Sequence, residues 1–437
     1  MINSQVQQPT DLIVAGAGPA GMAAAIAAAR QGARVLLLEK LPSPGAKLKA
    51  TGGGRCNLAS NLSNAEIMRR FGRDGRFMTP ALQACDCSRL IEFMAEIGVE
   101  CHVPDGMRVF PKDHNAGTVL SALEAEIKRL NIELHCSQTI DALVIEAGII
   151  KGVNCNNKLF LAESVILATG GRGYPTMGSD GSGLKLAATA GHTVTELFPA
   201  MLPLQTRETW VKNCRADTIG KAEIRIDLPE AKKLQARGDL IFTSDGIRGP
   251  VVLDFAREIT PLLARYGEVP LLVNLVKGMN EEELRKHIDN RRKAEPKLTV
   301  AQALSGLLPE PLAAELCRQA GLDLAKPLKD QPGSSRDRLL KLLVATPLTV
   351  IGHAGWEAAM VTRGGVSLKE IRPETLESRL IRGLYFCGEI VNLDGPCGGY
   401  NLHWCFASGL LAGQRAANSA AIAGQSLSVT ESSSIRK

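Results

Sequence analysis

One strand–helix–strand segment near the start of the chain constrains the fold more than any other feature. Asp11–Ala15 is an apolar run typical of a buried strand, and the turn Gly16–Gly21 (GAGPAG) leads into a helical run that ends near Arg30. A second apolar strand, Arg34–Glu39, ends in a carboxylate 18 residues beyond Gly21. This order predicts a dinucleotide-binding βαβ unit. Its glycines let the backbone approach a pyrophosphate, and Glu39 accepts hydrogen bonds from a ribose diol.

The composition is typical of a globular protein with more than one domain. The chain has 437 residues, 45% of them hydrophobic and 22% charged, and a formal net charge of +6. That charge permits an anionic partner without requiring one. The first ten residues lack the apolar core of a signal peptide, and the longest apolar run, Met22–Ala29, is too short to span a bilayer. We therefore expect a cytoplasmic protein without membrane contact, whose eleven cysteines are free thiols.

The rest of the chain alternates between strand-like and helical stretches. Residues 81–100 and 116–131 are predicted to be helical, and residues 132–168 and 200–276 contain short apolar strands. Residues 280–344 are helical and charged. No second GxGxxG turn follows a strand, so we expect one built-in dinucleotide site, with any nicotinamide binding only transiently.

A segment near the end of the chain has the composition of a ligand-binding loop. Gly388–Cys405 (GEIVNLDGPCGGYNLHWC) places two carboxylates and four glycines directly after the predicted strand 383–388. Buried strands and helices do not need so many small and polar groups. The glycines remove side chains, so backbone N–H groups can reach a ligand.

These motifs resemble those of the BaiN/RdsA-type flavoproteins, also described as NAD(P)/FAD-dependent oxidoreductases. Family members include aminoacetone oxidases and ribosomal-RNA dihydrouridine synthases. The resemblance extends from about Asp11 to Ala416. Its most specific signatures are Gly52–Asn57, Tyr174–Gly178, Phe242–Gly246 with Gly249 and Pro250, Thr362–Val366, and Gly388–Cys405.

The resemblance implies an α/β fold with a discontinuous, Rossmann-like FAD-binding domain. We expect its first part at residues 1–195 and its last part at 370–420. An inserted β-rich domain at 196–276 would be completed by about 345–369, with an inserted helical subdomain at 277–344 and a flexible tail at 421–437. Because ligand sites favour domain interfaces, we expect substrate to enter where the insert faces the flavin, near Thr362–Val366.

The resemblance also implies that FAD is the cofactor and that Gly388–Cys405 faces the flavin. Glu389 would bind a ribityl hydroxyl, and the helix that starts after Gly399 would stabilise negative charge near flavin N1 and O2. The expected FAD contacts are Gly16, Gly18, Pro19, Ala20, Gly21, Glu39, Lys40, Lys47, Gly53, Gly54, Arg55, Cys56, Asn57, Ala168, Thr169, Gly170, Gly388, Glu389, Asp394, Gly398, Gly399, Tyr400 and Asn401.

Two cysteines are candidates for catalysis. Cys56 either packs near the cofactor, has a covalent role, or donates the proton that reduction of an activated C=C bond requires. Many family members have Thr where this chain has Cys397, so that thiol is either redox-active or a replacement for a hydroxyl. Cys387 and Cys405 are expected to pack in the core.

Two further clusters have less specific readings. Cys85, Cys87, Cys101 and His102 suggest a metal site, but CxC side chains diverge by about 200° on a helix, so we expect no metal. His114 either touches substrate or is a surface loop residue, and we expect the latter. The basic run 285–293 is either a solvated helix face or a contact for RNA phosphates.

Four functions are compatible with the motifs. The first is an NAD(P)H-dependent flavin reductase of a C=C or C=N bond, with a uridine of ribosomal RNA as one candidate substrate. The second is a flavin oxidase of a small amine such as aminoacetone, and the third is an RNA-binding protein with a structural flavin. The fourth is a steroid or bile-acid dehydrogenase, which no individual residue favours. The motifs identify neither the substrate nor the oligomeric state.

Overall fold

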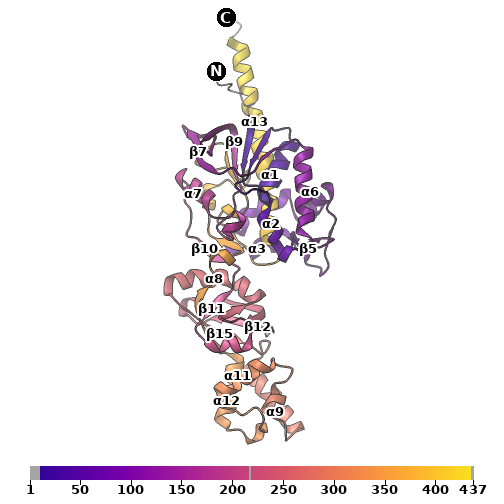
Figure 1. Cartoon of the computed structure of the whole chain (residues 1–437), viewed down its shortest axis with the longest axis vertical. Helices are drawn as coiled ribbons and strands as arrows, with labels where there is room; N and C mark the ends of the chain where they lie inside the picture. Colours follow the sequence, from indigo (N-terminus) through magenta and orange to yellow (C-terminus); the bar gives the residue numbers. More distant parts are fainter. Residues whose placement is uncertain (1–9, 216–217, 435–437) are drawn as a thin grey trace. The chain divides into compact units, whose positions relative to one another are not determined.

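The computed structural model describes residues 10–215 and 218–434, which form two compact units (Figure 1). The first comprises Met1–Leu197 and Val361–Lys437, and the second Phe198–Met360. The chain thus returns to the first unit at Val361, earlier than the expected residue 370. The reason is that Thr195 N donates to Gly365 O (2.9 Å) and Val366 N donates to Ile390 O (2.9 Å), which binds this segment to the first unit. The predicted absence of a signal peptide concerns residues 1–9, which lie outside the described residues.

The first unit is built around a seven-stranded sheet in which five strands run parallel. Its order is β6 (Glu133–His135), β2 (Val35–Leu38), β1 (Thr10–Ala15) and β9 (Lys158–Leu167), with β18 (Leu384–Phe386) also paired to β9. Strands β7 (Ile140–Glu146) and β8 (Ile149–Cys155) extend β9 as an antiparallel meander. Helix α1 (Pro19–Arg30) connects β1 to β2, so the predicted βαβ unit is confirmed.

A helix from the end of the chain packs closely against α1 of this βαβ unit. Helix α13 (Tyr400–Ser434) lies against α1, and a Cβ at Gly409 or Gly413 would come within 2.3 Å or 2.1 Å of the carbonyl oxygens of Ala20 and Ala24. Only glycine allows the two backbones to approach so closely. Helix α13 continues to residue 434, where we expected a flexible tail from 421; residues 435–437 lie outside the described residues.

The predicted helix 81–100 is wrong as a single element. Helix α4 (Thr79–Ala84) ends before Cys85, and α5 (Cys87–Glu96) begins after Asp86. The Asp86 carboxylate caps α5 by accepting a hydrogen bond from Arg89 N at 2.8 Å. Cys85 and Cys87 therefore flank a helix junction and do not lie on one helix.

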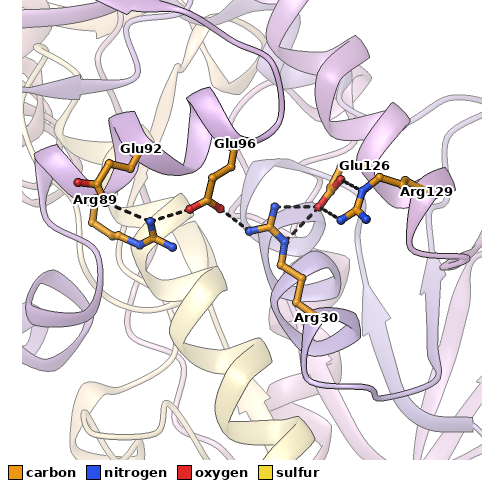
Figure 2. Close-up of polar contacts among 6 residues, drawn as sticks. All are labelled: Arg30, Arg89, Glu92, Glu96, Glu126 and Arg129. Carbon is orange, nitrogen blue, oxygen red and sulfur yellow. Dashed lines mark hydrogen bonds and ion pairs between the residues drawn. The ribbon is translucent and has the colours of Figure 1, made fainter.

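A chain of charged side chains joins three helices of the first unit (Figure 2). Arg30, at the end of α1, contacts Glu96 of α5 at 2.7 Å and Glu126 of α6 (Ala116–Arg129) at 2.8 Å. Glu126 also accepts from Arg129, and Glu96 from Arg89. The hydrogen bond from Arg129, together with Arg30, lowers the pKa of the buried Glu126 carboxyl to about 2.

The second unit combines a closed barrel with a helical insert. Six strands form the barrel, in the order β11 (Leu204–Thr206), β14 (Gly246–Arg248), β13 (Gln235–Phe242), β12 (Thr218–Ile226), β15 (Val269–Asn274) and β16 (Thr346–His353). Helix α8 (Pro250–Tyr266) packs against β13. Between β15 and β16 come α9 (Glu281–Ala294), α10 (Val300–Leu304), α11 (Glu310–Ala320) and α12 (Gly333–Val344). The predicted β-rich and helical parts are both present in this unit.

Candidate cofactor and active site

The glycine turn after β1 has the geometry that a dinucleotide needs. Gly16 has φ +99°, and a Cβ there would lie 2.7 Å from Ala168 O; a Cβ at Gly21 would lie 1.8 Å from Gly16 O. A Cβ at Gly18, the residue before α1, would meet no atom within 4 Å, so the backbone of Gly18 faces open space. Pro19 and Ala20 begin α1, whose first turn carries no acidic residue. This helix end is therefore open to an anion such as a pyrophosphate.

Glu39 lies directly after β2, at the same edge of the sheet. Its Oε2 accepts from Ala17 N at 2.8 Å and its Oε1 from Leu41 N at 2.9 Å. Each carboxylate oxygen has a second lone pair, which remains available to a ribose hydroxyl. The carboxylate thus also fixes the loops on either side of the site.

A cleft of about 480 Å³ borders Glu39. It is lined by His135, Cys136, Gln138, Lys158 and Phe160. Glu39 N donates to His135 O and Gln138 N donates to Glu39 O, so the backbone of Glu39 pairs with two residues that line the cleft. None of its lining residues was among the predicted contacts, because nothing in their local sequence marks them as ligand-binding.

The loop after β9 faces the same edge. Ala168 is buried, and Gly170 has φ +72°, where a Cβ would come within 2.7 Å of Ser179 Oγ. Thr169 Oγ1 is buried and has no hydrogen-bond partner in the described part of the chain. Lys40, in contrast, pairs with Asp180 at 2.6 Å.

The Gly52–Asn57 loop has a left-handed backbone over much of its length. Gly53 and Gly54 have φ +66° and +86°, and neither would place a Cβ closer than 4.0 Å to other atoms. Cys56 has φ +59° and its side chain is 0% exposed; burial raises the pKa of this thiol to about 12. Arg55 is exposed, with its guanidinium 5.7 Å from the ring centre of Phe110. The burial of Cys56 favours packing over proton donation.

Asn57 links that loop to the closing segment. With its side-chain amide oriented to satisfy both neighbours, its nitrogen donates to Ala59 O and its oxygen accepts from Gly399 N, both at 3.1 Å. A Cβ at Gly399 would lie 2.5 Å from Ala59 O, so only glycine fits. Asn57 therefore helps to hold the turn before α13, and its role as an FAD contact stays a prediction.

Side chains of α13 hold the closing segment from the other side. Trp404 Nε1 donates to Gly388 O at 3.0 Å, and Gly388 N donates to Ser408 Oγ at 2.9 Å. Asn401 exchanges two hydrogen bonds of 2.8 Å with the backbone of Gly395. Among the other predicted contacts, Asp394 and Tyr400 are buried, and Gly398 has φ +129°.

Glu389 is bound by the protein itself. Its Oε2 lies 2.9 Å from Lys47 Nζ, and its Oε1 accepts from Thr362 N at 2.9 Å. Thr362 Oγ1 in turn accepts from Arg172 N at 2.7 Å and Gly173 N at 3.2 Å. Sequence reasoning missed this network, although Thr362 lies in the signature Thr362–Val366.

The remaining candidate residues separate into different environments. Cys397 is half-buried in the closing segment, whereas Cys387 and Cys405 pack in the first unit. His114, expected on the surface, is half-buried because its ring contacts His102 (4.6 Å between ring centres) and Phe110 (5.0 Å). Within residues 10–215 and 218–434, no group of three or more His, Cys, Asp or Glu side chains could hold a metal ion.

The basic run lies on α9, where most of its cations have partners. Arg285 pairs with Glu281 and Asp337, Lys286 with Glu282, and Arg292 with Asp289. Arg291 donates to the carbonyl of Ala303 at 2.9 Å. Lys293 is exposed. Most of the positive charge is therefore compensated locally, which favours the solvated-face reading.

Comparison with known proteins identifies the family. The model of the HI0933-like protein Rossmann domain matches residues 10–415. The chain belongs to this family. It is an FAD-dependent oxidoreductase, because that is the class of the family.

Two relatives match over nearly their whole length. The 3-dehydro-bile acid delta(4,6)-reductase of Clostridium scindens is 32% identical, over 92% of this chain and 98% of that protein. The ribosomal RNA dihydrouridine synthase of Escherichia coli is 27% identical, over 91% of this chain and 96% of that protein. Of these two, the higher identity is to the bile-acid branch, which the sequence motifs had not favoured.

A solved structure shares the fold. The 3-ketosteroid delta1-dehydrogenase from Sterolibacterium denitrificans, in complex with 1,4-androstadiene-3,17-dione, aligns with a TM-score of 0.52 at 13% identity, covering 94% of this chain and all of that one. In the described part of the chain, no helix is both long and apolar enough to cross a membrane.

The site fits the cofactor of the family. The α1 end without acidic side chains suits a pyrophosphate, Glu39 suits a ribose, and the glycines at 18, 53 and 54 leave room for a ligand against the backbone. FAD would therefore be held by the carboxyl ends of β1, β2, β9 and β18.

Proposed function

We propose that this protein reduces a carbon–carbon double bond conjugated to a carbonyl group, using electrons from NADPH or NADH. The supporting observation is the full-length relationship, at 32% identity, to a protein named as a reductase of 3-dehydro-bile acids. Dihydrouridine, in the name of the second relative, is likewise uridine reduced at a double bond conjugated to a carbonyl. One bond type therefore accounts for both names.

Bound FAD would supply hydride to one end of the double bond. The residues of this chain would bind and orient the cofactor: α1 and Gly18 would hold the pyrophosphate and Glu39 the ribose. Asn57 and Trp404 hold the loops of the closing segment. The other end of the bond must receive a proton from an acid. Cys56 is 0% exposed, so we assign it to packing and not to this step.

Anaerobic mixing tests the proposal. The FAD-loaded protein is first reduced with NADPH, or with NADH, and then mixed with a 3-oxo-4-ene steroid, with its saturated ketone as the matched control. Unmodified ribosomal RNA forms a separate arm. We expect rapid reoxidation and a product with two added hydrogens from the conjugated substrate or from uridine, and none from the saturated ketone. The reduced protein is also mixed with air-saturated buffer, and if it is reoxidised there but by neither unsaturated substrate, it is an oxidase and the proposal is wrong.

A further inference from the structure

Lys47 is held at the cofactor site with one hydrogen-bond donor to spare. Its Nζ lies 2.9 Å from Glu389 Oε2 and 3.2 Å from Gly173 O, and the two charged side chains are only 21% and 15% exposed. A lysine ammonium carries three hydrogens. In the described part of the chain, those two oxygens are its acceptors. The third hydrogen is therefore available to a ligand.

Glu389, the partner of Lys47, is also held by a backbone N–H group. Glu389 Oε1 accepts from Thr362 N at 2.9 Å, and Thr362 Oγ1 accepts from the backbone of Arg172 and Gly173. A Cβ at Gly171 would come within 2.2 Å of Thr362 Oγ1 and 2.8 Å of Glu389 Oε1, so glycine is required there. The ion pair is therefore held in place by the protein before any ligand binds.

The neighbouring thiol of Cys405 adds no negative charge to the pair. From α13, Cys405 approaches the pair, and burial raises the pKa of its thiol to about 12, so it stays neutral. Glu389 is the carboxylate that Lys47 contacts in the described residues. The pair thus presents one ammonium whose charge is offset by one carboxylate.

The position of the pair corresponds to the flavin end of the cofactor. The pyrophosphate position is the start of α1, and the ribose position is Glu39 after β2, on one side of β1. On the other side lie β9 and β18, whose following loops carry Gly173 and Glu389. A dinucleotide bound along this edge would therefore have its flavin near Lys47.

We propose that Lys47 is the cation that stabilises the reduced form of FAD, and that Glu389 is the positioning residue that holds it and offsets its charge. Uptake of two electrons and one proton leaves a net negative charge on the ring, which a directed ammonium N–H stabilises. The inference goes beyond the proposed reduction, because it concerns the cofactor and holds for any electron acceptor.

The test is the midpoint potential of the FAD-loaded protein, measured by equilibration with a reference dye and without substrate. We expect Lys47→Met to weaken the binding of reduced FAD at least tenfold more than the binding of oxidised FAD, which lowers the potential by about 30 mV or more. Lys49→Met, in the same short helix but exposed, is the matched control and leaves the potential unchanged. Glu389→Gln removes the offsetting charge and raises the potential.

A lower potential in Lys47→Met together with a higher potential in Glu389→Gln indicates an electrostatic role for the pair. A purely structural role would leave both potentials unchanged or shift both in the same direction. If Lys47→Met weakens both redox forms of FAD equally, Lys47 contacts another part of the cofactor and the inference is wrong. If that variant loses FAD altogether, Lys47→Arg and Glu389→Gln decide. Lys47→Arg should keep the wild-type potential. If Glu389→Gln also keeps it, the proposal is wrong.

Discussion

At the scale of single residues, Glu39 both accepts backbone hydrogen bonds and is the expected ribose ligand, which decides the substitution that tests it. Its carboxylate accepts from the buried N–H of Ala17 and the half-buried N–H of Leu41, so replacement by alanine would leave both without this acceptor. Glu39→Gln keeps one acceptor and removes the charge. We expect FAD affinity to fall roughly 10- to 100-fold, since a hydrogen bond to a charged group contributes about 1.5–3 kcal/mol.

Fluorescence titration of the apoprotein with FAD measures this effect. Glu133→Gln is the matched control, because Glu133 is an exposed carboxylate of neighbouring β6 that pairs with His135. Equal FAD affinity in Glu39→Gln and wild type would show that Glu39 does not face the ribose.

Cys56 provides a second test at this scale. Its thiol is fully buried with a pKa raised to about 12, so it is protonated at neutral pH but without access to a substrate. We expect Cys56→Ser to retain FAD and to show near-wild-type rates for flavin reduction and reoxidation, with a lower melting temperature. Stopped-flow measurement of the two half-reactions checks this. Selective loss of reoxidation by substrate would make Cys56 the proton donor instead.

At the scale of secondary-structure elements, the charge network of Figure 2 makes stability depend on pH. The pKa of Glu126 is lowered to about 2, below its value in an unfolded chain, so its contribution is present above about pH 4.3. That contribution is lost as the pH falls from there toward 2. We expect Glu126→Gln to destabilise the protein by about 1–3 kcal/mol at pH 7 and by progressively less below pH 4.

Urea denaturation at a series of pH values measures this difference. Glu92→Gln is the control, because Glu92 is exposed and contacts only the outer end of the network at Arg89. A Glu126→Gln deficit that stays constant down to pH 2 would contradict the role of the ionised carboxylate.

Helix α9 allows an equally direct test of RNA binding. Arg291 donates to Ala303 O, so its removal would disturb the fold and it is kept. If ribosomal RNA binds through this face, Lys286→Ala with Lys293→Ala should flatten the plot of log affinity against log salt by about 0.7–0.9 per lost contact. Lys232→Ala with Lys233→Ala, both exposed near the barrel, is the charge-matched control. Equal slopes in both double variants rule out α9 as the contact.

The sequence predicts an element well when the residues that determine it are close together in the chain. The βαβ unit was predictable because its glycines, apolar runs and Glu39 follow one another directly. The break between α4 and α5 was missed although Asp86 is a typical N-cap. The contact between Lys47 and Glu389 joins residues 342 positions apart, and a single sequence carries no signal for such a pair. The same holds for Asn57 and Gly399, whose bond depends on where α13 packs.

At the scale of the whole molecule, the two units have separate hydrophobic cores. One core combines residues such as Leu12 and Trp404 from both ends of the chain, and the other contains residues such as Leu240 and Leu348 of the barrel. The proposed FAD contacts all lie in the first unit. FAD should therefore stabilise the first unit by joining segments distant in sequence, and leave the second unaffected.

Scanning calorimetry with increasing FAD tests this expectation. Ligand at 100 times its dissociation constant stabilises a binding unit by about 2.7 kcal/mol. We expect two transitions, one that moves to higher temperature with FAD and one that does not, and release of about one FAD per chain on heating. Glu39→Gln, with its weaker site, should reduce the shift of the first transition at equal FAD concentration and leave the second in place. A single transition that moves as a whole would show that the units unfold together, and a protein that never binds FAD would contradict the assigned site.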